Sequence, residues 1–357
     1  MRHSRFIQSK SILILSLLFF VLLTTSSFPE EWTHFADIVD IVKESGNFDY
    51  HMTHFDKKIE TDKLLSKYRE SNPDQKLVEK GGENIVEIHK PTKEVISLLE
   101  TAEKLMSQKY YDRAMEKLDR AQTRDPDYSR IDVLKGMIYF NRGRYRAALK
   151  QFDIAIKKNP IDFMAYKRRG DCYRKREKPE KALDNYILSI IYNRNYSDAW
   201  NALEDLGKEM RFSTYRLQFV PLYSFQKLDN GKVRIYFDDT ERTRWMPYSF
   251  TKAVWRYDSQ FFHEKTGLTE YRLLPREEIE CIRNMTWAYN TFRLHGKSGK
   301  DPILERLERI QYRFFLREFV LFEILSQRNP EILLNMGPRF REDLIDYIKE
   351  FVLLRGK

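Results

Sequence analysis

The sequence predicts a mainly α-helical fold, in which a superhelix of helix-turn-helix pairs is followed by an aromatic-rich α+β C-terminal domain with a β-hairpin. Three observations support this prediction: small residues recur every 34 positions in the middle of the chain, aromatic residues become dense after Met210, and an Asn-Gly pair lies between two apolar runs. With 357 residues, 63 Lys+Arg against 53 Asp+Glu and two cysteines, the chain is a basic globular protein with room for two or three domains.

Residues 1–27 have the composition of an export signal. Basic residues precede an uninterrupted apolar segment over 12–23, and the sequence Thr-Thr-Ser-Ser follows this segment. A helix of this length rises about 18 Å, short of the ~30 Å hydrocarbon core, which favours a removed signal peptide over an N-terminal anchor. We therefore expect an exported bacterial protein, either periplasmic or anchored in the inner membrane facing the periplasm. In the second case the N-terminal segment would be a membrane tether.

Residues 28–94 are predicted to form a helical arm and a linker. Apolar residues at helical spacing over 30–44 indicate one amphipathic helix, and a polar stretch follows it. His51 and His54 lie three positions apart and could share a metal ion on a helix. Because nothing nearby in the sequence supplies a third ligand, we interpret them as surface histidines and expect no metal site.

The repeat occupies residues 95–210. Its small residues keep a constant step and are Ala102, Gly136 and Gly170, then Ala114, Ala148 and Ala182. Large residues keep the same step at Leu118, Phe152 and Tyr186. Helix axes can approach closely only where one facing side chain is small and its neighbour fills the remaining space. Each 34-residue unit is therefore predicted to be a pair of antiparallel helices.

This pattern resembles the tetratricopeptide repeat (TPR), with three units at residues 95–128, 129–162 and 163–196. The third unit departs from the family pattern at Arg194, where Pro is expected. Trp200 and Leu203 suit a capping helix that covers the last unit. The resemblance implies a superhelix that binds a partner and has no chemistry of its own.

The resemblance also implies which residues line the concave groove, because the first helix of each unit faces it with fixed positions. In the second and third units these are Arg130, Val133, Met137, Phe140, Asn141, Met164, Lys167, Asp171, Arg174 and Lys175. Some members of the family grip a free C-terminal carboxylate with Lys and Asn at set positions. Only Arg168 fits that pattern, because Leu99, Glu103, Leu134 and Met164 occupy the other positions. We therefore reject a carboxylate clamp of that kind.

Residues 141–181 hold 14 Lys+Arg against 5 Asp+Glu, so almost the whole net charge of +10 lies in one part of the repeat. Such clustering favours a partner with an acidic segment. The alternative is that these cations are solvated outer faces of helices. A third interpretation is an anionic lipid or polymer ligand; export argues against a nucleic acid.

Residues 211–357 are predicted to form the α+β domain. Two apolar runs flank Asp229-Asn230-Gly231-Lys232, and Asn-Gly readily takes the two positive φ values of a tight hairpin turn. Residues 276–294, 302–327 and 339–354 are predicted helices that pack on the small sheet. We expect most of the aromatic side chains to be core, although a sugar-binding or peptide-binding platform is an alternative.

The chain lacks the local motifs of common enzymes, so we predict no catalytic residues and no cofactor. Acid/base candidates for a glycan hydrolase would be His263, Glu264, Glu277, Glu278 and Glu280, but these are interpreted as a charged helix face and first turn. Two cysteines, Cys172 and Cys281, could be free or bridged in an oxidising compartment.

We therefore expect a non-catalytic protein-protein interaction scaffold or adaptor in the bacterial cell envelope, with an envelope protein bound in the groove. The alternative is an envelope enzyme, active on glycans or wall polymers, whose catalytic C-terminal domain is recruited by the repeats.

Overall fold

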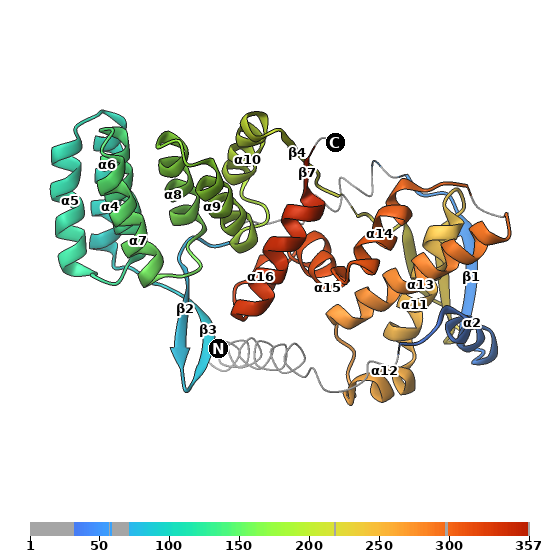
Figure 1. Cartoon of the computed structure of the whole chain (residues 1–357). Helices are drawn as coiled ribbons and strands as arrows, with labels where there is room; N and C mark the ends of the chain where they lie inside the picture. The colour runs from blue at the N-terminus through green and yellow to red at the C-terminus, as the bar shows by residue number, and fades with distance from the viewer. Residues whose placement is uncertain (1–31, 57, 59–70, 218, 297–298, 356–357) are drawn as a thin grey trace, which may run out of the picture.

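The computed structural model describes residues 32–56, 58, 71–217, 219–296 and 299–355. Figure 1 shows an elongated molecule with the repeat helices at one end and the C-terminal domain at the other. The expected export signal at residues 1–27 lies outside the described residues. Among the helices that are described, none combines the length and the apolar character needed to cross a membrane.

The repeat folds as three antiparallel helix pairs and a capping helix, as the 34-residue step predicts. Its helices are α4 Lys93–Ser107, α5 Tyr111–Arg124, α6 Ser129–Asn141, α7 Tyr145–Lys158, α8 Phe163–Lys175, α9 Pro179–Tyr192 and α10 Ser197–Met210. Pro179 stands where the first two units carry Tyr, and it is tolerated because the first residue of a helix needs no backbone N–H donor.

Small and large residues are matched in size between the two helices of a unit. A Cβ added at Gly136 would lie 2.5 Å from the ring of Phe152, and one at Gly170 would lie 2.5 Å from the ring of Tyr186. The first unit instead has Ala102 and the smaller Leu118 in one cluster. The two helices of a unit therefore approach closely because a small residue on one faces a large residue on the other.

Each first helix ends on a residue with left-handed backbone at the same position of the unit. The φ values are 64° at Lys109, 70° at Gly143, 55° at Glu177 and 60° at Arg211. In the second unit the Arg144 N–H then donates to the Tyr139 carbonyl at 2.9 Å, which closes the helix end. Only the second unit uses glycine, the residue without a steric penalty in this conformation.

The C-terminal domain is built on a three-stranded sheet of order β1-β6-β5. β5 (Tyr223–Lys227) and β6 (Val233–Asp238) form the predicted antiparallel hairpin. Of its turn residues only Gly231 has positive φ, and its N–H donates to the Leu228 carbonyl at 3.0 Å. The prediction of a two-residue turn with two positive φ values is therefore wrong. The loop has one residue more than such a turn and needs only one left-handed residue.

Helices cover this sheet and connect it to the repeat. They are α11 Arg242–Tyr257, α12 Ser259–Thr266, α13 Pro275–Leu294, α14 Pro302–Tyr312, α15 Leu316–Phe319 and α16 Pro338–Tyr347, with short helical turns η1 Val320–Leu325, η2 Pro330–Leu333 and η3 Ile348–Val352. Two short strands, β4 (Phe212–Thr214) and β7 (Leu353–Arg355), pair antiparallel where the domain meets the repeat.

The predicted helix over 302–327 is interrupted. Phe314 adopts a left-handed φ of 62° and is 92% exposed, and the Phe315 N–H donates back to the Ile310 carbonyl at 3.0 Å. The interruption could not be predicted, because neither Gly nor Pro occurs between Pro302 and Gln327. The helix over 276–294 is confirmed, and the one over 339–354 ends as an α-helix at Tyr347.

Residues 32–56 belong to the C-terminal domain, which corrects their interpretation as an arm. α2 (Phe35–Glu44) confirms the predicted helix from Phe35 onward, and it packs on α11 and α13. β1 (Phe48–Thr53) pairs in parallel with β6. Asp49 and Arg234, 185 positions apart, form an ion pair across the two strands, and local pattern cannot reveal a pairing so distant in sequence.

The predicted linker is also structured in part. β2 (Gln75–Lys80) and β3 (Glu83–Ile88) form a hairpin in which Gly81 and Gly82 have φ values of 63° and 82°. A two-residue turn with two positive φ values is the kind that joins twisted strands tightly. The Gly-Gly pair is therefore the signal that the linker interpretation overlooked.

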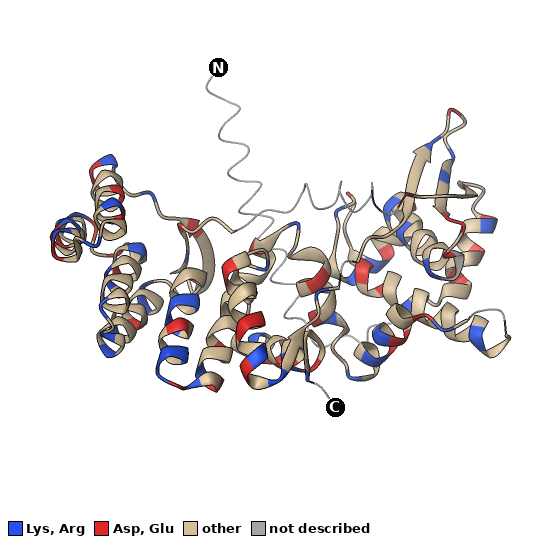
Figure 2. Ribbon diagram, turned by 90° about the horizontal axis from the view of Figure 1, so that it is seen from above, with Lys and Arg blue, Asp and Glu red and all other residues tan. Residues whose placement is uncertain are grey.

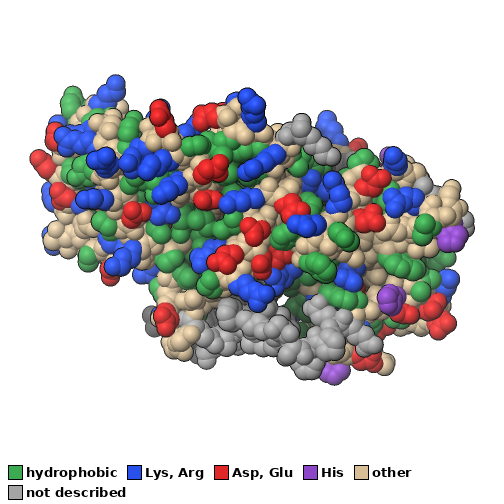
Figure 3. All heavy atoms as spheres, in the orientation of Figure 1, with side chains coloured by type: hydrophobic (Ala, Val, Ile, Leu, Met, Phe, Trp, Pro, Cys, Tyr) green, Lys and Arg blue, Asp and Glu red, His purple; other side chains and the backbone are tan. Residues whose placement is uncertain are grey.

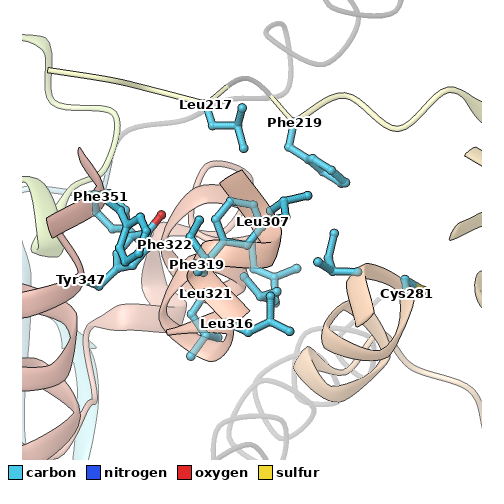
Figure 4. Packing of buried hydrophobic residues seen from close by; sticks show 14 of the residues in the cluster. Leu217, Phe219, Cys281, Leu307, Leu316, Phe319, Leu321, Phe322, Tyr347 and Phe351 are labelled. Carbon is cyan, nitrogen blue, oxygen red and sulfur yellow. The ribbon is translucent and has the colours of Figure 1, made fainter. Parts of the chain in front are cut away.

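Most of the aromatic residues are buried, as expected. One continuous cluster joins the C-terminal domain to the last repeat unit and to α2. In Figure 4, Leu217 and Phe219 lie over Leu307 and Phe319, while Phe322, Tyr347 and Phe351 gather beside them. Cys281 on α13 belongs to this cluster, and it and Cys172 are both buried free thiols, so a bridge between them is not formed.

Candidate functional site

The groove residues implied by the resemblance lie on α6 and α8, between α4 and α10. The apolar end has Met137 and Phe140 half-buried, with Ile96 of α4 42% exposed. Val133 is only 2% exposed because it packs between helices, so it supports the surface and does not line it. Apolar side chains left accessible on a concave face are suited to hold an apolar side chain of another protein.

Two cations of α8, Lys167 and Arg168, both form ion pairs with Asp171 of the same helix. The Lys167 Nζ lies 2.9 Å and the Arg168 Nη1 lies 3.4 Å from Asp171 Oδ2. The Tyr186 hydroxyl donates to Asp171 Oδ1 at 2.9 Å, and burial followed by the Asp171 charge raises the pKa of Tyr186. This hydroxyl therefore stays protonated and holds Asp171 in place between the two cations.

Two further groove cations are also paired within the repeat. Arg130 Nη2 lies 3.0 Å from Glu103 Oε1, and Arg174 Nε donates to Glu209 Oε1 at 2.9 Å. The hydrogen bond to Glu209 raises the pKa of Arg174. Figure 2 shows acidic residues interspersed with basic ones on these helices. The groove is therefore less cationic than its composition indicates, with Asn141 and Lys175 exposed at its end.

Sequence reasoning missed the groove residues of α10. The same unit positions, carried one unit further, fall on Asp198, Asn201, Asp205, Lys208 and Glu209, all of them exposed. These residues make the capping helix acidic and neutralise the cationic end of the groove. The signal was the constant 34-residue step, which extends into the helix that starts at Ser197.

The acid/base candidates of the C-terminal domain do not form one site. His263 and Glu264 are exposed on α12, whereas Glu277 and Glu278 are in the first turn of α13 as predicted but are buried. Lys252 Nζ lies 2.8 Å from Glu277 and also contacts Glu278. The expected charged surface face is therefore wrong for these glutamates, which belong to a buried ion-pair network.

A pocket of about 330 Å³ opens beside this network. Glu278 and the Tyr248 hydroxyl that donates to it at 2.5 Å lie in its wall, together with Tyr223 and Arg256. Burial raises the pKa of Tyr223 to about 12, so its hydroxyl is neutral at physiological pH. The pocket is a second concave feature of the chain, remote from the repeat groove.

His54 has acidic neighbours that the sequence did not reveal. Its Nδ1 lies 3.6 Å from Asp239 Oδ1, and Asp238 completes a group of three potential metal ligands. The Asp238 carboxylate, however, already accepts hydrogen bonds from the backbone of Phe55, Thr240 and Glu241. Its oxygens hold the chain at the end of β6, so the arrangement is explained without a metal ion.

The helices from α4 to α10 form an α-helical repeat module beside the C-terminal domain. Residues 133–199 match the sequence model of the tetratricopeptide repeat family, so the chain contains a tetratricopeptide-repeat domain. The protein thus carries a protein-protein interaction module.

Curated relatives are similar to about a third of the chain. The chain is 27% identical over 128 residues to Hsp70-Hsp90 organizing proteins 3 and 2 of Arabidopsis thaliana, which is 32% of this chain. It spans less than a quarter of the length of these relatives, 23% and 22% respectively.

Solved structures of TPR domains are also similar to about a third of the chain. The first TPR of Spaghetti (RPAP3), bound to an HSP90 peptide, is 23% identical, covers 35% of this chain and 98% of its own, and has a TM-score of 0.31. The Sgt2 TPR domain from Aspergillus fumigatus is 20% identical, covers 34% of this chain and 81% of its own, and has a TM-score of 0.32.

Proposed function

We propose that the protein is a non-catalytic scaffold of the bacterial cell envelope, which holds a segment of another envelope protein in the groove of its repeats. The observation that carries the proposal is the accessible apolar surface of Ile96, Met137 and Phe140 on the inner helices. Large apolar side chains that stay accessible on a curved surface are suited to a protein partner. The composition of residues 1–27 supports the envelope location.

In-cell crosslinking tests this proposal. A photo-crosslinking residue is placed at position 140 in the groove or, as a control, at position 154, where Ile154 is 41% exposed on α7. We expect one dominant adduct from position 140, identified by mass spectrometry as an envelope protein, and none from position 154. Groove binding is contradicted if position 140 gives no adduct, or if both positions give adducts equally. N-terminal sequencing of the same sample tests whether the export signal at residues 1–27 is removed.

The pocket beside Glu278 favours one second candidate, an enzyme active on glycans or wall polymers. Aromatic rings around a carboxylate suit a sugar, which stacks its C–H face and donates its hydroxyls. Glu278→Gln keeps the size of the side chain, so a hydrolytic activity that this variant abolishes, with the fold intact, would support the enzyme. Absence of any such activity in the wild-type protein would remove it.

A further inference from the structure

The turns between the first and second helices of the units lie along one edge of the repeat, the upper edge in Figure 1. Exposed basic residues occur in or beside each of these turns. They are named the turn row here and are Lys109, Arg144, Arg146, Lys175, Lys178 and Arg211. Figure 3 shows basic side chains gathered over the repeat half of the molecule.

Apart from Lys175, which lies at the end of the groove and belongs to both sets, the cations of the turn row differ from those of the groove in their partners. Among the described residues, none of the turn row forms an ion pair. In the groove, Arg130, Lys167 and Arg174 each contact a carboxylate of the repeat itself. The free positive charge predicted from the sequence is therefore displaced from the groove to the edge.

The opposite edge of the repeat is covered by the chain itself. Residues 71–92 cross the loops that join successive units, where Asn159 Nδ2 donates to the Gln75 carbonyl at 2.9 Å and Ser71 Oγ donates to the Tyr192 carbonyl at 3.0 Å. Both side chains are buried in this contact. A partner that leaves the groove therefore meets an open, basic edge only on the side of the turns.

We propose that the turn row binds an acidic, extended segment of the partner protein, adjacent to the segment held in the groove. The inference deepens the proposed function and rests on it, since it assigns the apolar part of the partner to the groove and the acidic part to the edge. Complementary charge raises the encounter rate and selects the partner, whereas the apolar contacts hold it.

An anionic membrane surface fits the edge less well than a polypeptide does. Exposed carboxylates of Glu177 and Glu180 alternate with the cations, and a flat anionic surface would repel both. A flexible chain can place its own acidic side chains beside the cations and pass the carboxylates at a distance.

Fluorescence anisotropy with a labelled deca-glutamate peptide and the purified full chain tests the inference. Wild-type protein is expected to bind the peptide in low salt and to lose it in high salt. Arg144→Glu, Arg146→Glu and Lys178→Glu together should weaken binding by about tenfold or more. Conversely, Glu177→Lys with Glu180→Lys should tighten it, a gain that misfolding cannot produce.

The matched control reverses three exposed cations of the other domain, Lys43→Glu, Lys232→Glu and Lys300→Glu, and so changes the net charge equally. Binding by this control should stay within about twofold of wild type. Equal loss in both triple variants would show a net-charge effect and overturn the inference. The inference would also be overturned if the wild-type protein did not bind the peptide, including the case in which it binds only phosphatidylglycerol vesicles.

The two proposals fail separately. A crosslink at position 140 together with no peptide binding leaves the groove function standing and removes the turn row. The opposite case needs two results. The wild-type protein gives no crosslink at position 140, and the Met137→Glu variant, in which the groove is disrupted, still binds the peptide. These results would remove the groove function and leave the turn row standing.

Discussion

The guanidinium of Arg194 and the carboxylate of Glu323 form a buried ion pair between the repeat and the C-terminal domain. Arg194 Nη2 lies 2.7 Å from Glu323 Oε2, and the two side chains are 4% and 1% exposed. The rings of Trp200 and Phe322 lie 4.6 and 4.7 Å from the guanidinium carbon. The position at which the family pattern has Pro is thus occupied by the residue that joins the two parts of this molecule.

Replacing Arg194 with Met should destabilise the junction by about 3–5 kcal/mol, because it leaves the Glu323 carboxylate buried without its counter-charge. Guanidinium chloride unfolding measures the loss. The double variant Arg194→Met with Glu323→Leu removes both charges and should recover to within about 1 kcal/mol of wild type. A double variant as unstable as the single one would show that packing, not charge, holds the junction.

The repeat could be predicted from sequence because its determinants are local and periodic. Gly136 and Phe152 are 16 positions apart and recur with the same step in the next unit, so spacing alone identifies them. The junction could not be predicted, because Arg194 and Glu323 are 129 positions apart and occur once. The departure at Arg194 was visible in the sequence, but its reason depends on a residue of the other domain.

In the groove, too, the sequence predicts the positions of the residues but not their contacts. Spacing places Lys167 and Arg174 on one helix, and the structure agrees, but spacing does not reveal that Asp171 and Glu209 take up their charges. The Glu209 partner belongs to the next unit, so it is found only when the unit positions are carried into α10. Composition thus predicted an acidic partner for the groove, whereas contacts direct that expectation to the turns.

Gly136→Ala should destabilise the protein by about 1–3 kcal/mol, because its Cβ would lie 2.5 Å from the Phe152 ring and the tightly packed pair must separate. Thermal unfolding followed by circular dichroism measures the change. Adding Phe152→Leu recreates the combination of Ala102 with Leu118 in the first unit and should recover part of the loss. Additive losses in the double variant would refute size matching at this site.

Glu177→Gly should stabilise the protein by about 1 kcal/mol. Glu177 has a φ of 55°, which is strained for a residue with a Cβ, whereas glycine adopts it freely. The reverse change at the equivalent position, Gly143→Ala with a φ of 70°, should destabilise by a similar amount. Urea midpoints of both variants measure the pair, and shifts of the same sign in both would contradict the argument.

Glu280 is predicted to make stability fall as pH rises from about 4.5 toward neutrality. Its Oε1 accepts from the Thr33 N–H at 3.1 Å, while burial raises the pKa of Glu280 more than this bond and nearby cations lower it. The folded chain therefore keeps a proton that the unfolded chain has lost, so unfolding releases a proton and becomes more favourable as pH increases. Glu280→Gln keeps the acceptor without ionising, so its melting temperature should exceed that of wild type at pH 7 and match it near pH 4. Glu264→Gln, at an exposed site, should show no such pH-dependent difference, and an equal gap at both pH values for Glu280→Gln would rule out the titration.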